Sequence, residues 1–92
     1  MSFYLKDPNS EVDYGIDWAV YLGGEAIAAS DWTVFPQEPG GVVVDAQGFS
    51  PTRSAATLAG GIPGRVYSIS NHVTLSSGRS DDRSITLRVE QR

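Results

Sequence analysis

The sequence contains no cysteine, which excludes disulfide bonds, a thiolate metal site and a catalytic thiol. It also has no apolar run near the ~20 residues that a membrane-spanning helix requires. The segment Met1–Lys6 lacks the basic stretch and the following apolar segment of a secretion signal. We therefore expect a soluble protein that is made in the cytoplasm. With 92 residues, the chain is long enough for one domain.

Groups that usually carry catalysis are scarce. The single histidine, His72, falls on the outward side of an alternating strand pattern, where an imidazole is usually a solvated surface group. Asp13 and Asp17 share a strand face roughly 13 Å apart, wider than the ~5 to 9.5 Å between paired glycosidase carboxylates. Asp81 and Asp82 do not fit the ligand spacing of a calcium loop. The sequence therefore predicts a protein that is not an enzyme, with no catalytic residue, no metal and no cofactor.

Charge is distributed unevenly along the chain, whose formal net charge is -4. Residues 1–50 contain eight acids and one lysine, and residues 51–92 contain three acids and six arginines. The acidic balance argues against nucleic acid as a partner. Halves of opposite sign can attract each other within one fold or between copies in an assembly, or they can simply form a solvated surface.

Alternating hydrophobicity dominates the chain, and no stretch has the period of a useful amphipathic helix. The clearest strand is predicted over Val12–Leu22, where every second residue is apolar. Gly23-Gly24 follows at once and predicts a hairpin turn, because both glycines accept a positive φ. The returning strand is expected over Glu25–Phe35.

This second strand has an irregular pattern. Ile27 and Trp32 have opposite parity, so a regular strand cannot place both in the core. We expect a bulge or kink near residues 28–31 that redirects Trp32 and Val34 inward.

A corner rich in glycine and proline over Leu58–Gly64 leads into a long predicted strand, Tyr67–Leu75. The pattern resembles the tyrosine corner of immunoglobulin-like and fibronectin-type sandwiches, in which a tyrosine hydroxyl bonds back to the preceding loop. By this resemblance Tyr67 takes the corner role, and Ile69 takes the position of the second core cysteine of those folds.

Further short strands are expected at 42–44, 54–58 and 85–89. The pattern as a whole predicts an all-β chain of about seven strands, arranged as an immunoglobulin or fibronectin type III-like two-sheet sandwich. Residues 11–92 are predicted to form this single domain, after an N-terminal arm over 1–10. The predicted structural core consists of large inward residues: Tyr14, Ile16, Trp18, Trp32, Tyr67 and Ile69.

Candidate partner contacts are the apolar residues of the arm and one outward aromatic residue: Phe3, Tyr4, Leu5 and Tyr21. The arm either packs on its own sandwich or docks on a neighbouring subunit, and the sequence leaves both arrangements open.

Several short motifs are spread along the chain: Lys6-Asp7-Pro8, Asp13-Tyr14, Asp17-Trp18, Leu22-Gly23-Gly24, Trp32-Thr33-Val34, Tyr67-Ser68-Ile69-Ser70-Asn71 and Arg79-Ser80-Asp81-Asp82-Arg83-Ser84. In this combination the sequence resembles a family of small tailed-phage virion structural proteins of the fiber-tail adaptor type. The similarity spans nearly the whole chain. It implies an immunoglobulin-like fold, a location in the virion and a non-enzymatic role, with no catalytic residues to transfer.

The expected partners are other virion proteins, namely tail, fiber, neck or capsid subunits, with no nucleic acid and no membrane. We also expect a homo-oligomer or repeated copies in the virion. The main hypothesis is an adaptor at the tail and its fibers or at the neck, and the alternative within this class is a decoration protein on the capsid. A different class, a carbohydrate or host-surface binding module, would need exposed aromatic residues such as Tyr21 or an unburied Trp32.

Overall fold

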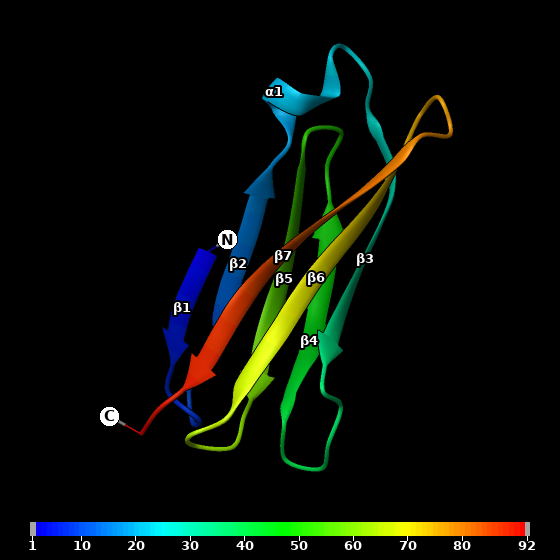
Figure 1. The fold of residues 1–92 in the computed structure, drawn as a ribbon. Helices are drawn as coiled ribbons and strands as arrows, with labels where there is room; N and C mark the ends of the chain where they lie inside the picture. The colour runs from blue at the N-terminus through cyan, green and yellow to red at the C-terminus, as the bar shows by residue number, and fades with distance from the viewer. Residues whose placement is uncertain (1, 92) are drawn as a thin grey trace.

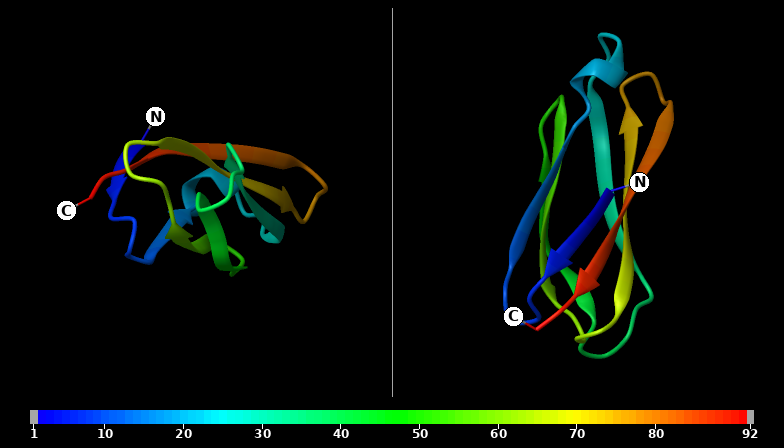
Figure 2. Two further views of the ribbon diagram at one scale, coloured as in Figure 1. Left: turned by 90° about the horizontal axis from the view of Figure 1, so that it is seen from below. Right: turned by 60° about the vertical axis from the view of Figure 1, so that its left-hand side comes forward.

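The computed structural model describes residues 2–91, apart from the side chains of Ser2 and Phe3. In chain order the elements are β1 (Ser2–Lys6), β2 (Val12–Asp17), α1 (Ala19–Leu22), β3 (Ile27–Phe35), β4 (Val42–Phe49), β5 (Arg53–Gly60), β6 (Val66–Leu75) and β7 (Ser80–Val89). A four-stranded sheet of order β1-β7-β6-β3 lies against a three-stranded sheet of order β2-β5-β4 (Figure 1). Seen from below in Figure 2, these sheets form two layers. The prediction of a two-sheet β-sandwich is confirmed.

The first predicted strand is too long. β2 ends at Asp17, and the chain turns into the short helix α1, so Val20 is fully exposed instead of inward. The turn is fixed by the N–H of Trp18, which donates to the Thr52 carbonyl (2.9 Å), and by the Asp17 carboxylate, which accepts from the N–H of Ala19 (2.9 Å). These bonds draw the chain away from the strand direction while the Trp18 ring stays fully buried.

The predicted hairpin at Gly23-Gly24 is also wrong. Both glycines do have positive φ, and Gly23 ends α1 in the left-handed conformation. The connection, however, crosses from one sheet to the other, since β2 pairs with β5 and β3 pairs with β6. Gly23 therefore ends the helix, and Gly24 lies in a connection that crosses from one sheet to the other.

The predicted irregularity in the second strand is confirmed. The register of β3 against β6 shifts between Ile27 and Ala29, and Ile27, Trp32 and Val34 are all buried. A second register shift lies in β4 between Val44 and Ala46. It lets β4 continue to Phe49, five residues beyond the strand expected at 42–44.

The corner before β6 is held by Tyr67. Its ring is fully buried, and its hydroxyl accepts a hydrogen bond from the N–H of Ile62 (3.3 Å), five residues earlier. The same hydroxyl donates to the Glu38 carboxylate (2.8 Å) in the loop between β3 and β4. Tyr67 thus ties two loops together at one end of the sandwich, and burial together with Glu38 raises the pKa of its hydroxyl.

Polar side chains also cross between the layers inside the core. The hydroxyl of Ser54 on β5 accepts a hydrogen bond from Trp18 Nε1 (3.0 Å) and donates to Asn71 Oδ1 on β6 (2.5 Å). Asn71 Nδ2 in turn donates to Ser30 Oγ on β3 (2.9 Å) and to the Asp31 carbonyl (3.1 Å). Sequence reasoning missed this network, which links three strands of the two sheets.

The first residues of the predicted arm form β1, an edge strand parallel to β7 with Ser2 opposite Ile85 and Lys6 opposite Val89. Lys6 is 1% exposed, and its ammonium group donates to the carbonyls of Gly60 (2.6 Å) and Asp7 (2.8 Å). Burial lowers the pKa of Lys6, and the nearby carboxylates of Asp7 and Glu11 oppose that shift. The lysine therefore fastens the end of β1 to the end of β5.

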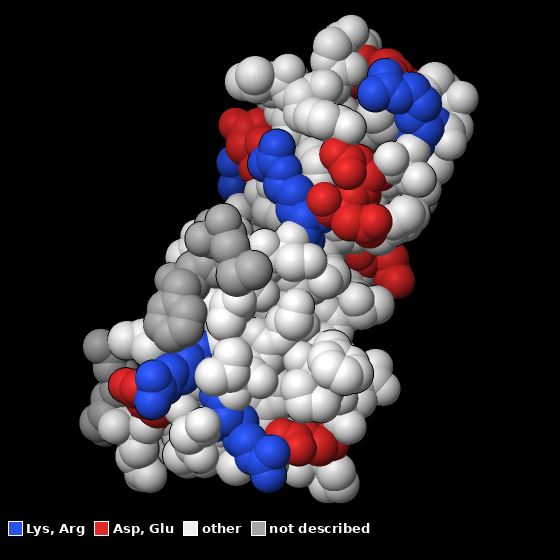
Figure 3. Space-filling model, viewed as in Figure 1, with Lys and Arg blue, Asp and Glu red and all other residues white. Residues whose placement is uncertain are grey.

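The oppositely charged halves of the sequence meet within the fold. Arg79 pairs with Glu25 (3.2 Å) and Arg65 with Glu38 (3.9 Å), so each pair joins an arginine from 51–92 to an acid from 1–50. Both signs also appear side by side near both ends of the face shown in Figure 3. Part of the uneven charge is thus balanced inside one chain.

Candidate docking surfaces

Three apolar side chains stand out at the α1 end of the molecule, and we call them the end patch: Val20, Tyr21 and Phe49. α1 is held over the loop between β4 and β5 by the bond from Trp18 to Thr52, and the start of β3 is held there by a bond from Ile27 to Pro51. Leu22 is the residue of α1 that enters the core, so Val20 and Tyr21 lie on its outer side.

Tyr21 is fixed in place although it is exposed. Its ring meets the Trp18 ring edge-to-face with centroids 5.8 Å apart. A hydrogen bond with the Asp81 carboxylate raises the pKa of Tyr21 and lowers the pKa of Asp81. An immobilised aromatic side chain loses little conformational entropy when a partner covers it.

A second apolar surface, the face patch, lies on the outer side of the four-stranded sheet near the opposite end: Leu5, Phe35 and Val66. The register places Leu5 and Val66 on either side of Arg88, and Phe35 beside Ser68. Phe35 is the most exposed of the three, at 75%. Figure 3 shows this face, on which an uncharged area separates the charged groups of the upper half from those at the lower end.

The two patches are well separated. The molecule is elongated, with extents of 42 × 21 × 18 Å, and α1 lies at the end opposite to the loop that follows Phe35 (Figure 1). The chain therefore has exposed apolar side chains at two separate places.

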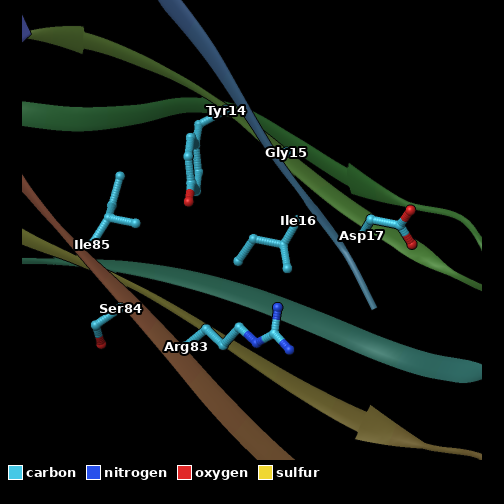
Figure 4. Close-up of a pocket in the computed structure, with 7 residues that line it drawn as sticks. All are labelled: Tyr14, Gly15, Ile16, Asp17, Arg83, Ser84 and Ile85. Carbon is cyan, nitrogen blue, oxygen red and sulfur yellow. The ribbon is translucent and has the colours of Figure 1, made fainter. Parts of the chain in front are cut away.

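The sandwich is also open along the side where β2 and β7 approach each other. A hollow of about 370 Å³, which we call the Arg83 hollow, is lined by Tyr14, Gly15, Ile16, Asp17, Arg83, Ser84 and Ile85. Tyr14 and Ile16 point into it from β2, and Arg83 and Ile85 point into it from β7 (Figure 4). Asp17 and Ser84 point away.

Aromatic rings line this open side. Tyr14 meets Tyr4 of β1 edge-to-face at 5.1 Å and Trp32 in the core at 5.9 Å. The Arg83 guanidinium lies over the Trp18 ring, 4.5 Å from its centroid. Burial and the hydrogen bond with Tyr4 raise the pKa of Tyr14 to about 12. The buried Trp18 ring thus contacts both Arg83 of the hollow and Tyr21 of the end patch.

Of the four residues predicted as partner contacts, three have described side chains. Tyr4 and Leu5 are exposed and line a smaller hollow of about 180 Å³ beside β1, and Tyr21 belongs to the end patch. The side chain of Phe3 lies outside the described residues.

Most of the predicted core residues lie inside the sandwich. Five of them are buried: Ile16, Trp18, Trp32, Tyr67 and Ile69. Tyr14 is only partly buried and packs against the core from the open side.

Arg83 was missed from the sequence, although a signal was present. The inward parity of Ile85, Leu87 and Val89 extends back to position 83, which places an arginine on the core side of the strand. An inward charge at the end of a strand pattern is a recognisable feature of sheet edges.

The only histidine of the sequence forms a surface pair with a carboxylate. His72 is exposed on β6 and pairs with Asp82 on β7 through Nδ1 (2.6 Å). Residues 2–91 contain no cluster of three or more histidines and carboxylates that could hold a metal ion. No helix in this part of the chain is long and apolar enough to cross a membrane.

The fold and these surfaces define a small structural binding domain, with exposed apolar side chains near both ends of a rigid sandwich. Residues 6–88 match the family model described as podophage GP4 fiber-tail adaptor protein gp77. Because the match covers most of the chain, the protein belongs to this family of fiber-tail adaptors, which are non-enzymatic structural components of the phage virion tail. No curated protein matches the sequence. The family resemblance predicted from the sequence is confirmed.

Proposed function

We propose that this adaptor works as a stiff wedge that joins the tail to a fiber protein through its two apolar patches. The observation that carries the proposal is the placement of the end patch and the face patch near opposite ends of a 42 Å body. Exposed apolar area that a partner can cover favours association. The end patch contacts one of the two neighbours and the face patch contacts the other.

We further propose that the fold is immunoglobulin or fibronectin type III-like. The strand order supports this, because a sheet of β7, β6 and β3 faces a sheet of β2, β5 and β4, as in the seven-stranded members of that class. The corner bond from the Tyr67 hydroxyl to Ile62 supports it as well.

Repeated copies in the virion are also part of the proposal. Each patch is small, and a small interface gives weak binding for a single subunit. Several copies on a symmetric tail add their contacts, so the attachment becomes strong without large individual interfaces. A homo-oligomer or a ring of separate copies satisfies this requirement equally.

The capsid decoration alternative lacks a comparable observation, since the family description places its members between fiber and tail. The glycan-binding alternative required an exposed Trp32, but this side chain is 4% exposed and cannot stack on a sugar. We therefore retain the adaptor alone.

The test introduces a charge into each patch separately, as Val20→Asp and Phe35→Asp, in a phage that carries the variant as its only copy of the gene. Purified particles are analysed by quantitative mass spectrometry for the adaptor and for the fiber protein. One variant should give particles that retain the adaptor and lack fibers, and the other should give particles that lack both. Gln47→Asp, at an exposed position of β4, serves as the control. Particles with normal amounts of both proteins in every variant would reject the two-surface arrangement.

A further inference from the structure

The open side of the sandwich exposes main-chain groups as well as side chains. Directly after β2 the N–H of Trp18 donates to the carbonyl of Thr52, directly before β5, and the antiparallel register of the two strands continues from this pair. Hydrogen-bonded and non-bonded pairs alternate along such a ladder. The N–H and C=O groups of Asp13, Gly15 and Asp17 therefore point away from β5, and no strand of the described residues pairs with β2 on that side.

β7 has a similar but less open edge. The N–H of Val89 bonds toward β6, at Arg65, and the N–H of Glu90 bonds toward β1, at Lys6. By this alternation Ser80, Asp82 and Ser84 face the β1 side, where β1 extends only as far as Ile85. The Asp82 N–H is already taken by the Asp81 carboxylate (2.8 Å). Of the two edges, β2 is thus the more available for pairing.

Charges of both signs lie beside this edge: two arginines and, on the outer face of β2, the carboxylates of Asp13 and Asp17. Arg83 lies on the inner side of the opening, and Arg53 lies on the outer side, with Nη2 2.8 Å from where a Cβ of Gly15 would be. Among residues 2–91 neither arginine forms a salt bridge. The two carboxylates of β2 are engaged locally, Asp13 by the Thr57 hydroxyl and Asp17 by the N–H of Ala19.

We propose that the open edge of β2 accepts an extended segment of a second virion protein, which adds to the three-stranded sheet as a fourth strand and carries a carboxylate at one inward position. The main chain of that segment pairs with the free groups of Asp13, Gly15 and Asp17. Its side chains alternate between the two faces of the sheet. One inward side chain enters the Arg83 hollow and places its carboxylate on Arg83. The outward side chains of the segment are not acidic, because they lie beside Asp13 and Asp17 of β2. Strand addition of this kind draws affinity from main-chain bonds and specificity from alternate side chains.

This inference rests on the proposed adaptor function and adds the mode of attachment and the chemistry of the partner. The partner is the protein that covers the end patch, because Trp18 connects Arg83 to Tyr21. Blocking the edge must therefore reproduce the particle defect of Val20→Asp and not that of Phe35→Asp.

A matched pair of substitutions at Gly15 isolates the main-chain contribution. Gly15→Pro removes an N–H that faces the open edge, and proline is tolerated at such edge positions. Gly15→Ala adds a Cβ at the same place but keeps the N–H. In both variants the added Cβ meets the flexible end of Arg53.

The experiment measures the adaptor and the fiber protein in purified particles from phage that carry each variant. We expect Gly15→Pro to lower the protein bound through the edge by about tenfold or more, and Gly15→Ala to stay near wild type. Thermal unfolding of each purified variant establishes that it folds. If Gly15→Pro does not fold, Arg83→Glu is decisive in its place, since it reverses the charge that faces the inward carboxylate of the segment and is expected to give the same loss.

Photo-crosslinking within wild-type particles provides an independent readout. A photoreactive residue at position 15 should react with one short segment of a single other virion protein, while a photoreactive residue at Val43 on β4, at the opposite edge, should not. Normal particles with folded Gly15→Pro and Arg83→Glu would overturn the strand-addition proposal. Self-association of Arg83→Ala together with normal particles would also overturn it, because Arg83 would then only protect the edge. Absence of the wild-type protein from particles would instead reject the adaptor function itself.

Discussion

Ser54 of β5 donates a 2.5 Å hydrogen bond to Asn71 of β6, so the two sheets are joined by a polar contact inside the core. Both residues are fully buried. Ser54 also accepts a hydrogen bond from Trp18, and Asn71 also donates one to Ser30. In a chain with no cysteine, this network provides a specific link between the layers where a disulfide bond is absent.

Removal of the amide at this link should be costly. Asn71→Ala leaves the hydroxyls of Ser54 and Ser30 without their partner, and we expect a loss of about 2 to 3 kcal/mol in the free energy of unfolding. Urea denaturation measures this loss. Ser68→Ala, at an exposed position of the same strand, should change stability by less than about 0.5 kcal/mol. Equal effects of the two substitutions would show that the network adds nothing specific.

Two glycines in the corner before β6 should respond differently to alanine. Gly61 has φ +119°, and a Cβ there would lie 2.6 Å from Val89 Cγ2, so Gly61→Ala is expected to cost about 3 kcal/mol. Gly64 has φ +86° with open space around it, so Gly64→Ala should cost only about 1 kcal/mol. Thermal and urea unfolding of both variants tests this order. A reversed order would contradict the packing of the corner against β7.

Lys6 should control the attachment of β1. Lys6→Ala removes the bonds to Gly60 and Asp7 and the buried stem, and we expect a loss of about 2 kcal/mol in the free energy of unfolding. Hydrogen exchange should accelerate most in β1. Lys6→Met keeps the length of the stem and should give a smaller loss. Unchanged exchange in β1 of Lys6→Ala would contradict this role.

Stability should fall in strong alkali partly through Tyr14, whose pKa is raised to about 12. The folded protein holds this phenolic proton more tightly than the unfolded chain, so the contribution is complete below the ordinary tyrosine pKa of about 10. It is lost as the pH rises from there toward 12. Tyr14→Phe should therefore lose less stability than wild type between about pH 10.5 and 12 when urea midpoints are compared. Parallel pH profiles for the two proteins would contradict the assignment.

Much of the fold follows from local pattern. Alternation located the strands, and the opposite parity of Ile27 and Trp32 was sufficient to predict the bulge in β3. The resemblance at Tyr67 predicted its bond to the preceding loop. These features depend on neighbouring residues, so one sequence is enough to reveal them.

The failures have a different physical origin. The apolar alternation from Val12 to Leu22 predicted a strand that continues past the end of β2. A strand would bury Trp18 and Leu22, and the observed turn and helix bury them as well, so the alternation does not distinguish the two structures. The change of sheet after Gly24 depends on pairing with β6, about 45 residues away in the chain, which local turn signals do not report. Asn71 and Ser54 read as polar surface residues because hydropathy does not register polar partners inside a core.

The candidate docking surfaces were only partly predictable. Tyr4, Leu5 and Tyr21 were identifiable as large apolar residues that lie outside the predicted core. The open edge was not, because it arises where β1 stops at Ile85 and β2 lacks a second neighbour, and both are properties of the assembled sheets.

Cryo-electron microscopy of the intact virion shows directly whether two different proteins cover the two patches. We expect copies of a 42 Å two-layered sandwich between the tail and the fibers, with one end covered by one protein and the outer face of the four-stranded sheet covered by another. Density for the sandwich on the capsid shell, or with both patches open to solvent, would contradict it.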